Sequence, residues 1–256
     1  MIRRETDKGC IIINQHDHAG LAGRLMSFWG NSTFTEPLPS DDVLFAISEH
    51  DAGWIEWDSN PKINNNTGYP ANFMEMSNHE QCIIWRKCYS KHALSHPYSS
   101  SLIALHFSKF NKKAISKNSS NGEAKILQAD MKDFVSDHLG ISFSDSDFSE
   151  LPTGVAVNLR LLQVGDIISL ALCHGWLEFE IEDVPLDYDG NSVSIKLSSE
   201  NGYNYLIDPY PFNKSNIELS VESQILTSKI FRDDSEYRQA VSNSESRNLW
   251  FTVYEA

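Results

Sequence analysis

The strongest constraint on the fold lies in residues 153–174, which read TGVAVNLRLLQVGDIISLALCH. Apolar residues cover most of the circumference that this stretch would have as a helix, so it predicts a long helix buried on most sides. Its polar residues recur at three- and four-residue spacing and form a single stripe, made of Arg160, Gln163, Asp166, Ser169 and Cys173. Asp166 is the most informative, because a buried carboxylate must either ligate a metal or pair with a cation such as an arginine.

A second polar island, His50-Asp51, ends a helix predicted over residues 41–51. Neighbouring residues on a helix point about 100° apart, which is too far for one ordinary surface contact. Both side chains can still reach one ion just beyond the helix end, where Gly53 allows the chain to turn away. The alternative is a capping aspartate beside a core histidine.

Two more islands contain histidine. Residues 15–18, QHDH, lie where a strand predicted over residues 9–14 gives way to a helix predicted over residues 17–29. We expect only one of His16 and His18 to be a ligand. His18 is the better candidate because it shares a helix face with the apolar Ala22. His106 lies in an apolar helical segment. It is either a hydrogen-bonded core residue or a group that faces a second metal or a substrate phosphate.

The chain changes character after Gly175. Earlier segments have helical periodicity, whereas residues 176–182, 192–197 and 217–221 alternate with period two, as half-buried strands do. We therefore predict an α+β fold: a mainly helical bundle with a small antiparallel C-terminal sheet, which can take in the N-terminal strand and the final segment. In domain terms, residues 1–176 form a helical metal-site domain and residues 177–256 a β-rich region packed on it.

Composition narrows the class of protein. A formal net charge of −14 over 256 residues argues against a nucleic-acid polymer as the main partner, because phosphate backbones require a basic surface. A small anionic substrate remains compatible, since a metal supplies local positive charge. We find no run of about 18 apolar residues and no signal peptide, so no membrane partner is expected. The cysteines, 4 in number, include no Cys-x-x-Cys pair and are typical of reduced thiols in a cytoplasmic protein.

The order of the islands resembles a known pattern. A His on one helix, a His-Asp pair on a second and an Asp on a later one is the pattern of the HD superfamily of metal-dependent phosphohydrolases, and residues 46–53, AISEHDAG, are similar to its His-Asp segment. Trp54 stands where that superfamily has lysine. Over nearly the whole chain the sequence also resembles a bacterial family of uncharacterised proteins, in residues 15–23, 49–57, 105–107, 162–170 and 208–212. The first resemblance implies an HD-like bundle, and the second implies a shared fold and site without an activity.

These observations lead to one functional hypothesis with two alternatives. The hypothesis is a metal-dependent hydrolase that acts on a small phosphoester or nucleotide through a divalent Mn, Mg, Co, Ni or Fe ion. Asp51 and His106 would be catalytic, and the ligands would be His18, His50, Asp51 and Asp166, with His16 as a further candidate. The alternatives are a di-iron oxygenase, which would need His16 and His106 as extra ligands, and a non-enzymatic interaction module with a remnant metal site. The hypothesis requires the four main ligands to converge on one point.

Overall fold

The computed structural model of the chain describes residues 1–141, 143 and 150–255. Its central element is α7, Thr153–His174, which has the bounds that the sequence predicts and ends at Gly175 in the left-handed conformation. By length and composition α7 is apolar enough to cross a membrane, with a mean hydropathy of 1.6, but 78% of that window is buried inside the protein. The apolar surface of α7 is therefore accounted for by its place in the core, which is consistent with a soluble protein.

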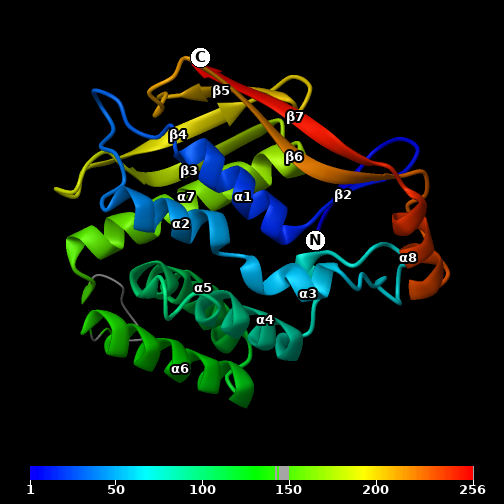
Figure 1. The fold of residues 1–256 in the computed structure, drawn as a ribbon, viewed down its shortest axis with the longest axis horizontal. Coiled ribbons are helices and arrows are strands. Elements are labelled where there is room, and N and C mark those ends of the chain that lie inside the picture. Colours follow the sequence, from blue (N-terminus) through cyan, green and yellow to red (C-terminus); the bar gives the residue numbers. More distant parts are fainter. Residues whose placement is uncertain (142, 144–149, 256) are drawn as a thin grey trace.

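The helices stack in layers beneath a sheet (Figure 1). The helices α1 (Gln15–Met26) and α7 lie against the sheet, and α2 (Ser40–Glu49) packs on both of them. The next layer is α5 (Pro97–Lys117), which contacts α2 and α7. On its outer side lie α4 (Asn78–Ser90) and α6 (Gly122–Leu139). Short helices follow α2 and the loop after it: η1 (Ala52–Trp54), α3 (Ile55–Asp58) and η2 (Phe73–Glu75).

The sheet has seven strands in the order β1-β2-β6-β7-β5-β4-β3. Their bounds are β1 Ile2–Glu5, β2 Cys10–Ile13, β3 Glu178–Pro185, β4 Ser192–Ser198, β5 Asn204–Asp208, β6 Asn216–Leu226 and β7 Ser246–Glu255. The N-terminal hairpin joins the later strands through β2 and β6, with Cys10 opposite Leu226. Every neighbouring pair is antiparallel except β5 and β7, which run parallel. The helix α8 (Asp234–Asn243) connects β6 to β7.

The predicted fold class, a mainly helical HD-like bundle with a small antiparallel C-terminal sheet, is wrong. The sheet is large, mixed and curled, and it includes strands from both ends of the chain. Two physical reasons explain the error. The segment IRRE of β1 lacks a strand pattern and is held by pairing with β2, and the parallel pairing of β5 with β7 leaves no local signal. The two-domain division at residue 176 stays a prediction, with one sheet drawing strands from both sides.

Glycines allow the three ligand-bearing helices α1, α2 and α7 to approach closely. A Cβ atom on Gly165 of α7 would lie 2.7 Å from Cγ of Met26 on α1 and 3.2 Å from Cγ2 of Ile47 on α2. A Cβ atom on Gly23 of α1 would collide with the side chain of Ser48 on α2. Because packed carbon atoms do not normally approach within about 3.5 Å, larger residues would separate these helices. The crossing therefore places the predicted ligands on neighbouring helical turns.

Candidate metal centre

The four predicted main ligands converge in the interior of the protein. His18 from α1 places Nε2 3.0 Å from Oδ2 of Asp51 and 3.8 Å from Oδ1 of Asp166. His50, which follows α2, places Nε2 3.6 Å from the same Asp51 oxygen and 3.5 Å from the same Asp166 oxygen. All four residues are buried. The end of α2 thus directs both His50 and Asp51 toward the space between α1 and α7.

His106 of α5 joins this group from the opposite side. Its Nε2 atom lies 3.7 Å from Oδ2 of Asp166, so the two oxygens of that carboxylate face different histidines. In the described part of the chain, two overlapping sets have ligand atoms within 4.8 Å of one another: His18, His50 and Asp51, and His50, His106 and Asp166. Imidazole and carboxylate together suit divalent transition metals. The buried His/Asp cluster can therefore hold a metal ion.

Hydrogen bonds fix the protonation of the His18 ring. The Ser169 hydroxyl donates to the carbonyl oxygen of Asp166, one turn earlier on α7, at 2.8 Å. Its oxygen therefore accepts from Nδ1 of His18, which lies 2.7 Å away, and Nδ1 carries the proton. The other nitrogen, Nε2, faces the carboxylates and lies 3.0 Å from Oδ2 of Asp51, where it can donate an N–H or present its lone pair to a cation. This is the arrangement by which a second polar residue orients a metal-ligating histidine.

His50 is oriented in the same way by the backbone. Its Nδ1 atom lies 2.7 Å from the carbonyl oxygen of Ile47, which can only accept, so Nδ1 carries the proton. Its Nε2 atom is buried and has no hydrogen-bond partner among the described residues. Two imidazole nitrogens thus face two carboxylates. The lone pairs of the imidazole nitrogens and those of the carboxylate oxygens repel one another unless a cation or a proton lies between them.

The protonation of the cluster follows from burial opposed by mutual charge. Burial favours the neutral form of Asp166, but His50, His106 and His18 outweigh it and lower the pKa of the carboxyl to about 2. Burial likewise disfavours the charged form of His50, yet Asp51 and Asp166 raise its pKa to about 9. Burial dominates at His106 and lowers its pKa to about 4. Without a metal, then, His50 holds a proton near neutral pH and His106 does not.

The alternative reading of Asp166, an ion pair with arginine, finds no counterpart in the described residues. The ion-pair partners of Asp166 in this part of the chain are three histidines, His18, His50 and His106. The arginine nearest along α7, Arg160, instead donates to the backbone carbonyl oxygens of Glu182 and Asp183 in β3.

His16, the further candidate ligand, lies outside the cluster. Its Nε2 atom is 3.2 Å from Oε2 of Glu49, and the same oxygen is 3.2 Å from Nε2 of His92 in the segment after α4. These contacts lower the pKa of Glu49, the hydrogen bond with His16 being the largest cause. Because His16 and His18 are two residues apart on α1, their side chains leave the helix in different directions. The structure therefore places His18 in the cluster and His16 outside it.

Two residues of the centre were not assigned a role from the sequence. Ser169 belongs to the polar stripe of α7, three residues after Asp166, and this spacing is the signal that could have identified it. Gln15, at the start of α1, places Nε2 3.3 Å from Oδ2 of Asp51 and holds that carboxylate against the cluster. The Oε1 atom of Gln15 is buried without a hydrogen-bond partner among the described residues.

The role of Ser169 can be tested directly. In a Ser169→Ala variant, Nδ1 of His18 loses its acceptor, and the ring is no longer held with Nε2 toward the carboxylates. We expect metal affinity to fall about 10–100-fold, the usual cost of losing a residue that orients a ligand. Ser101→Ala is the matched control, because that buried hydroxyl bonds only the backbone of α5, at Pro97. Titration with a metal-sensitive dye measures both variants, and equal affinities would contradict the assignment.

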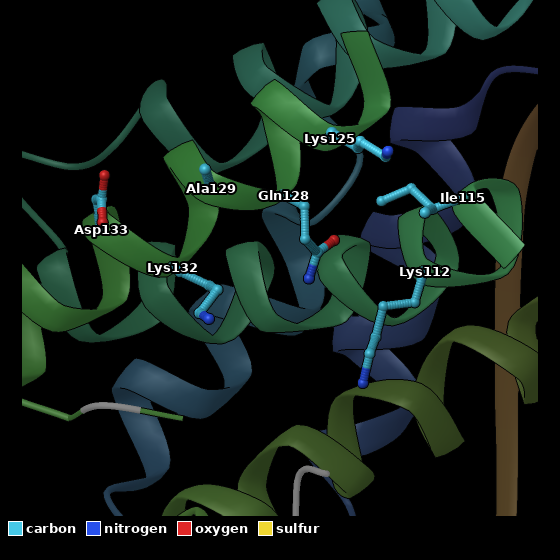
Figure 2. A pocket seen from close by; sticks show the side chains of 7 residues that line it. All are labelled: Lys112, Ile115, Lys125, Gln128, Ala129, Lys132 and Asp133. Carbon is cyan, nitrogen blue, oxygen red and sulfur yellow. The ribbon is translucent and has the colours of Figure 1, made fainter. Parts of the chain in front are cut away.

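A separate groove lies on the outer side of the helical layers. It has a volume of about 520 Å³ and lies between α5 and α6, lined by Lys112, Ile115, Lys125, Gln128, Ala129, Lys132 and Asp133 (Figure 2). Gln128 is held by internal hydrogen bonds to Ser108 and Asn111. None of the cluster residues lines this groove. We therefore assign the chemistry to the buried cluster and not to this groove.

The fold and the site define a protein with a curled mixed sheet over layered helices and a buried His/Asp cluster that can hold a metal. A family model described as "Protein of unknown function (DUF3891)" matches residues 1–228, and the chain belongs to this family. No curated protein and no solved structure matches the chain. The resemblance to an uncharacterised family is thus confirmed, and the comparisons give no support for the HD superfamily.

Proposed function

We propose that this protein is a metal-dependent hydrolase of a small phosphoester or nucleotide. The observation that carries the proposal is the orientation of His18 and His50. In both rings the Nδ1–H group donates to a fixed acceptor, and both rings direct Nε2 at the two carboxylates Asp51 and Asp166. Without a metal, His50 carries a proton that relieves the repulsion, and a divalent cation can take the place of that proton. A divalent ion also balances the two negative charges.

The residues fit such an ion by their chemistry. Two neutral imidazoles and two carboxylates suit Mn, Co, Ni or Fe, and Mg to a lesser extent. When bound, the ion supplies Lewis acidity to a phosphoryl oxygen and lowers the pKa of water. His18, His50, Asp51 and Asp166 would hold it. His106, which faces the second oxygen of Asp166, would hold a second ion or contact the substrate.

Two side chains are placed to move or orient protons. Asp51 is held by Gln15 with one oxygen directed into the cluster, and it serves as a proton acceptor as well as a ligand. His106 is neutral near pH 7, because burial lowers its pKa to about 4. Its Nδ1 atom is buried with no hydrogen-bond partner among the described residues, so it is available to a bound molecule. A positioned histidine of this kind contributes about 10²–10⁴-fold to proton-transfer steps.

The reaction class rests on ligand order, and the alternatives are weaker. The sequence of His, His-Asp and Asp along the chain is that of the HD phosphohydrolases, although the fold differs and the family match adds no activity. The di-iron oxygenase would need His16, which is occupied by Glu49. We further propose that the protein is cytoplasmic and that its partner is a small phosphorylated molecule. Neither a nucleic-acid polymer nor a membrane is a partner in this proposal.

The test is metal-dependent turnover. Metal-free protein is loaded separately with Mn, Mg, Co, Ni or Fe, its metal content is measured, and each form is assayed against a panel of phosphomonoesters, phosphodiesters and nucleotides. We expect stoichiometric binding of at least one metal and turnover that a chelator removes and re-added metal restores. Stoichiometric metal with no turnover on any ester would contradict the hydrolase and favour the interaction module. Two iron atoms per chain with oxygen consumption would favour the oxygenase.

A further inference from the structure

A pair of cations meets one helical turn from the candidate metal centre. Nζ of Lys109 on α5 lies 3.2 Å from Oε1 of Gln163 on α7, and Nη1 of Arg160 lies 3.3 Å from the same oxygen. Two positive charges therefore share one neutral acceptor. Partial burial of Lys109 lowers its pKa, and repulsion from Arg160 adds to this shift. A neutral amide oxygen is a weaker partner for a cation than an anion would be.

The pair is attached to the centre through both helices. Lys109 is three residues after His106, and Gln163 is three residues before Asp166, so each lies on the same helix face as the cluster residue. Lys109 is close enough for its charge to contribute to lowering the pKa of His106. The cation pair therefore lies beside the His106 and Asp166 side of the centre.

The local charge is opposite to that of the molecule. The chain carries a formal net charge of −14, yet the charged groups that act on Lys109 are Arg160, Lys113, Lys112 and one carboxylate, Asp183. In the described part of the chain, neither Lys109 nor Arg160 forms an ion pair within 4.0 Å. The other nitrogens of Arg160 are fixed by the carbonyl oxygens of Glu182 and Asp183, whereas Lys109 is exposed and can move toward a ligand.

We propose that Lys109, Gln163 and Arg160 form an anion subsite that binds the phosphate group of the substrate at the metal centre. This proposal rests on the proposed function and narrows its substrate class to phosphate monoesters, whose terminal dianion requires more positive charge than a metal with two carboxylate ligands provides. Lys109 contacts the phosphate directly. Arg160 and Gln163 act as positioning residues that hold Lys109 beside the His106 and Asp166 side of the centre.

The test compares Lys109→Gln with Lys117→Gln. Both substitutions remove one positive charge from α5, but Lys117 lies two turns farther from the centre, in the last turn of the helix. Inorganic phosphate is titrated calorimetrically into the metal-loaded and the metal-free protein. We expect the Kd for phosphate to rise about tenfold in Lys109→Gln, as for loss of a charge-assisted hydrogen bond, and to change less than about twofold in Lys117→Gln. Lys109→Arg, which keeps the charge, should retain most of the affinity.

Failure of this proposal is distinguishable from failure of the hydrolase. Equal phosphate affinities in Lys109→Gln and Lys117→Gln, or no phosphate binding by either form of the wild-type protein, would overturn the subsite even if esters are hydrolysed. Loss of phosphate binding in Lys109→Gln would support it even if no ester is turned over. Where 4-nitrophenyl phosphate is a substrate, Lys109→Gln should raise KM about tenfold and leave kcat within about twofold. A lower kcat with unchanged KM would contradict a binding role.

Discussion

Replacing Asp166 should abolish metal binding while leaving a folded protein. We expect Asp166→Ala and Asp166→Asn to lower metal affinity by more than about 100-fold, because each removes a ligand and the charge that balances the ion, whereas loss of an orienting residue alone costs about 10–100-fold. Asp166 faces three histidines at 3.5–3.8 Å, more than any other residue of the cluster. Metal content after loading and desalting measures the effect.

Stability separates a ligand from a structural ion pair. In the metal-free protein, Asp166→Asn removes one partner of protonated His50, and breaking a buried pair in this way costs about 3–5 kcal/mol. Asp130→Asn is the control, because its ion pair with Arg86 lies at the surface and surface pairs contribute about 0–1 kcal/mol. Unchanged metal content together with a much lower unfolding free energy would refute the ligand assignment of Asp166.

The helices could be predicted well because their signals are local. The apolar circumference of residues 153–174 gives α7 with its observed bounds, and Gly175 ends it in the left-handed conformation. The helix around His106, α5, continues to Lys117, beyond the apolar segment that marks it in the sequence. Polar residues of that last part face solvent or the groove with α6, so they support a helix without an apolar stripe.

The sheet could not be predicted because strand pairing is not local. Cys10 pairs opposite Leu226, and Asn204 opposite Thr252 in parallel, so the neighbours that complete these strands lie far away in sequence. The alternation of residues 176–182 indicates a strand but not its partner. Hence β3, β4, β6 and β7 were predicted as β-structure, whereas β5, the helix α8, and the size, curvature and mixed character of the sheet were missed.

The sequence predicts polar residues that do lie close together in the core, whereas their roles as ligands and catalytic groups stay predictions. Isolated polar residues on apolar helices indicated His18, His50, Asp51 and Asp166, since buried polar groups need partners. The residues that orient them were missed because Ser169 and Gln15 act through hydrogen bonds whose partners lie on other helices. The sequence favours His18 over His16 by its helix face, and α1, which begins at Gln15, places the two side chains in different directions.

The pH dependence of stability should have opposite signs with and without metal. In the metal-free protein Asp51 and Asp166 outweigh burial and raise the folded-state pKa of His50 to about 9, above its unfolded value of about 6.5. A raised pKa stabilises the fold fully below pH 6.5, and this contribution is lost as the pH rises through 9. We expect a loss of about 3 kcal/mol in unfolding free energy over this interval. Urea titrations of the metal-free protein at several pH values measure it.

Metal loading should reverse this trend, because a ligating imidazole must be neutral. Rising pH then removes the proton that competes with the ion, tightens binding and adds stability in proportion to the logarithm of the affinity. The substitution His50→Asn should flatten the dependence of unfolding free energy on pH in the metal-free protein between pH 6.5 and 9. His106→Asn is the matched control: its pKa of about 4 lies outside the window, so that variant should keep the slope. Two results would contradict this assignment: a metal-free protein whose stability does not fall between pH 6.5 and 9, or an equal loss of slope in both variants. Either would show that His50 does not carry the proton that a metal displaces.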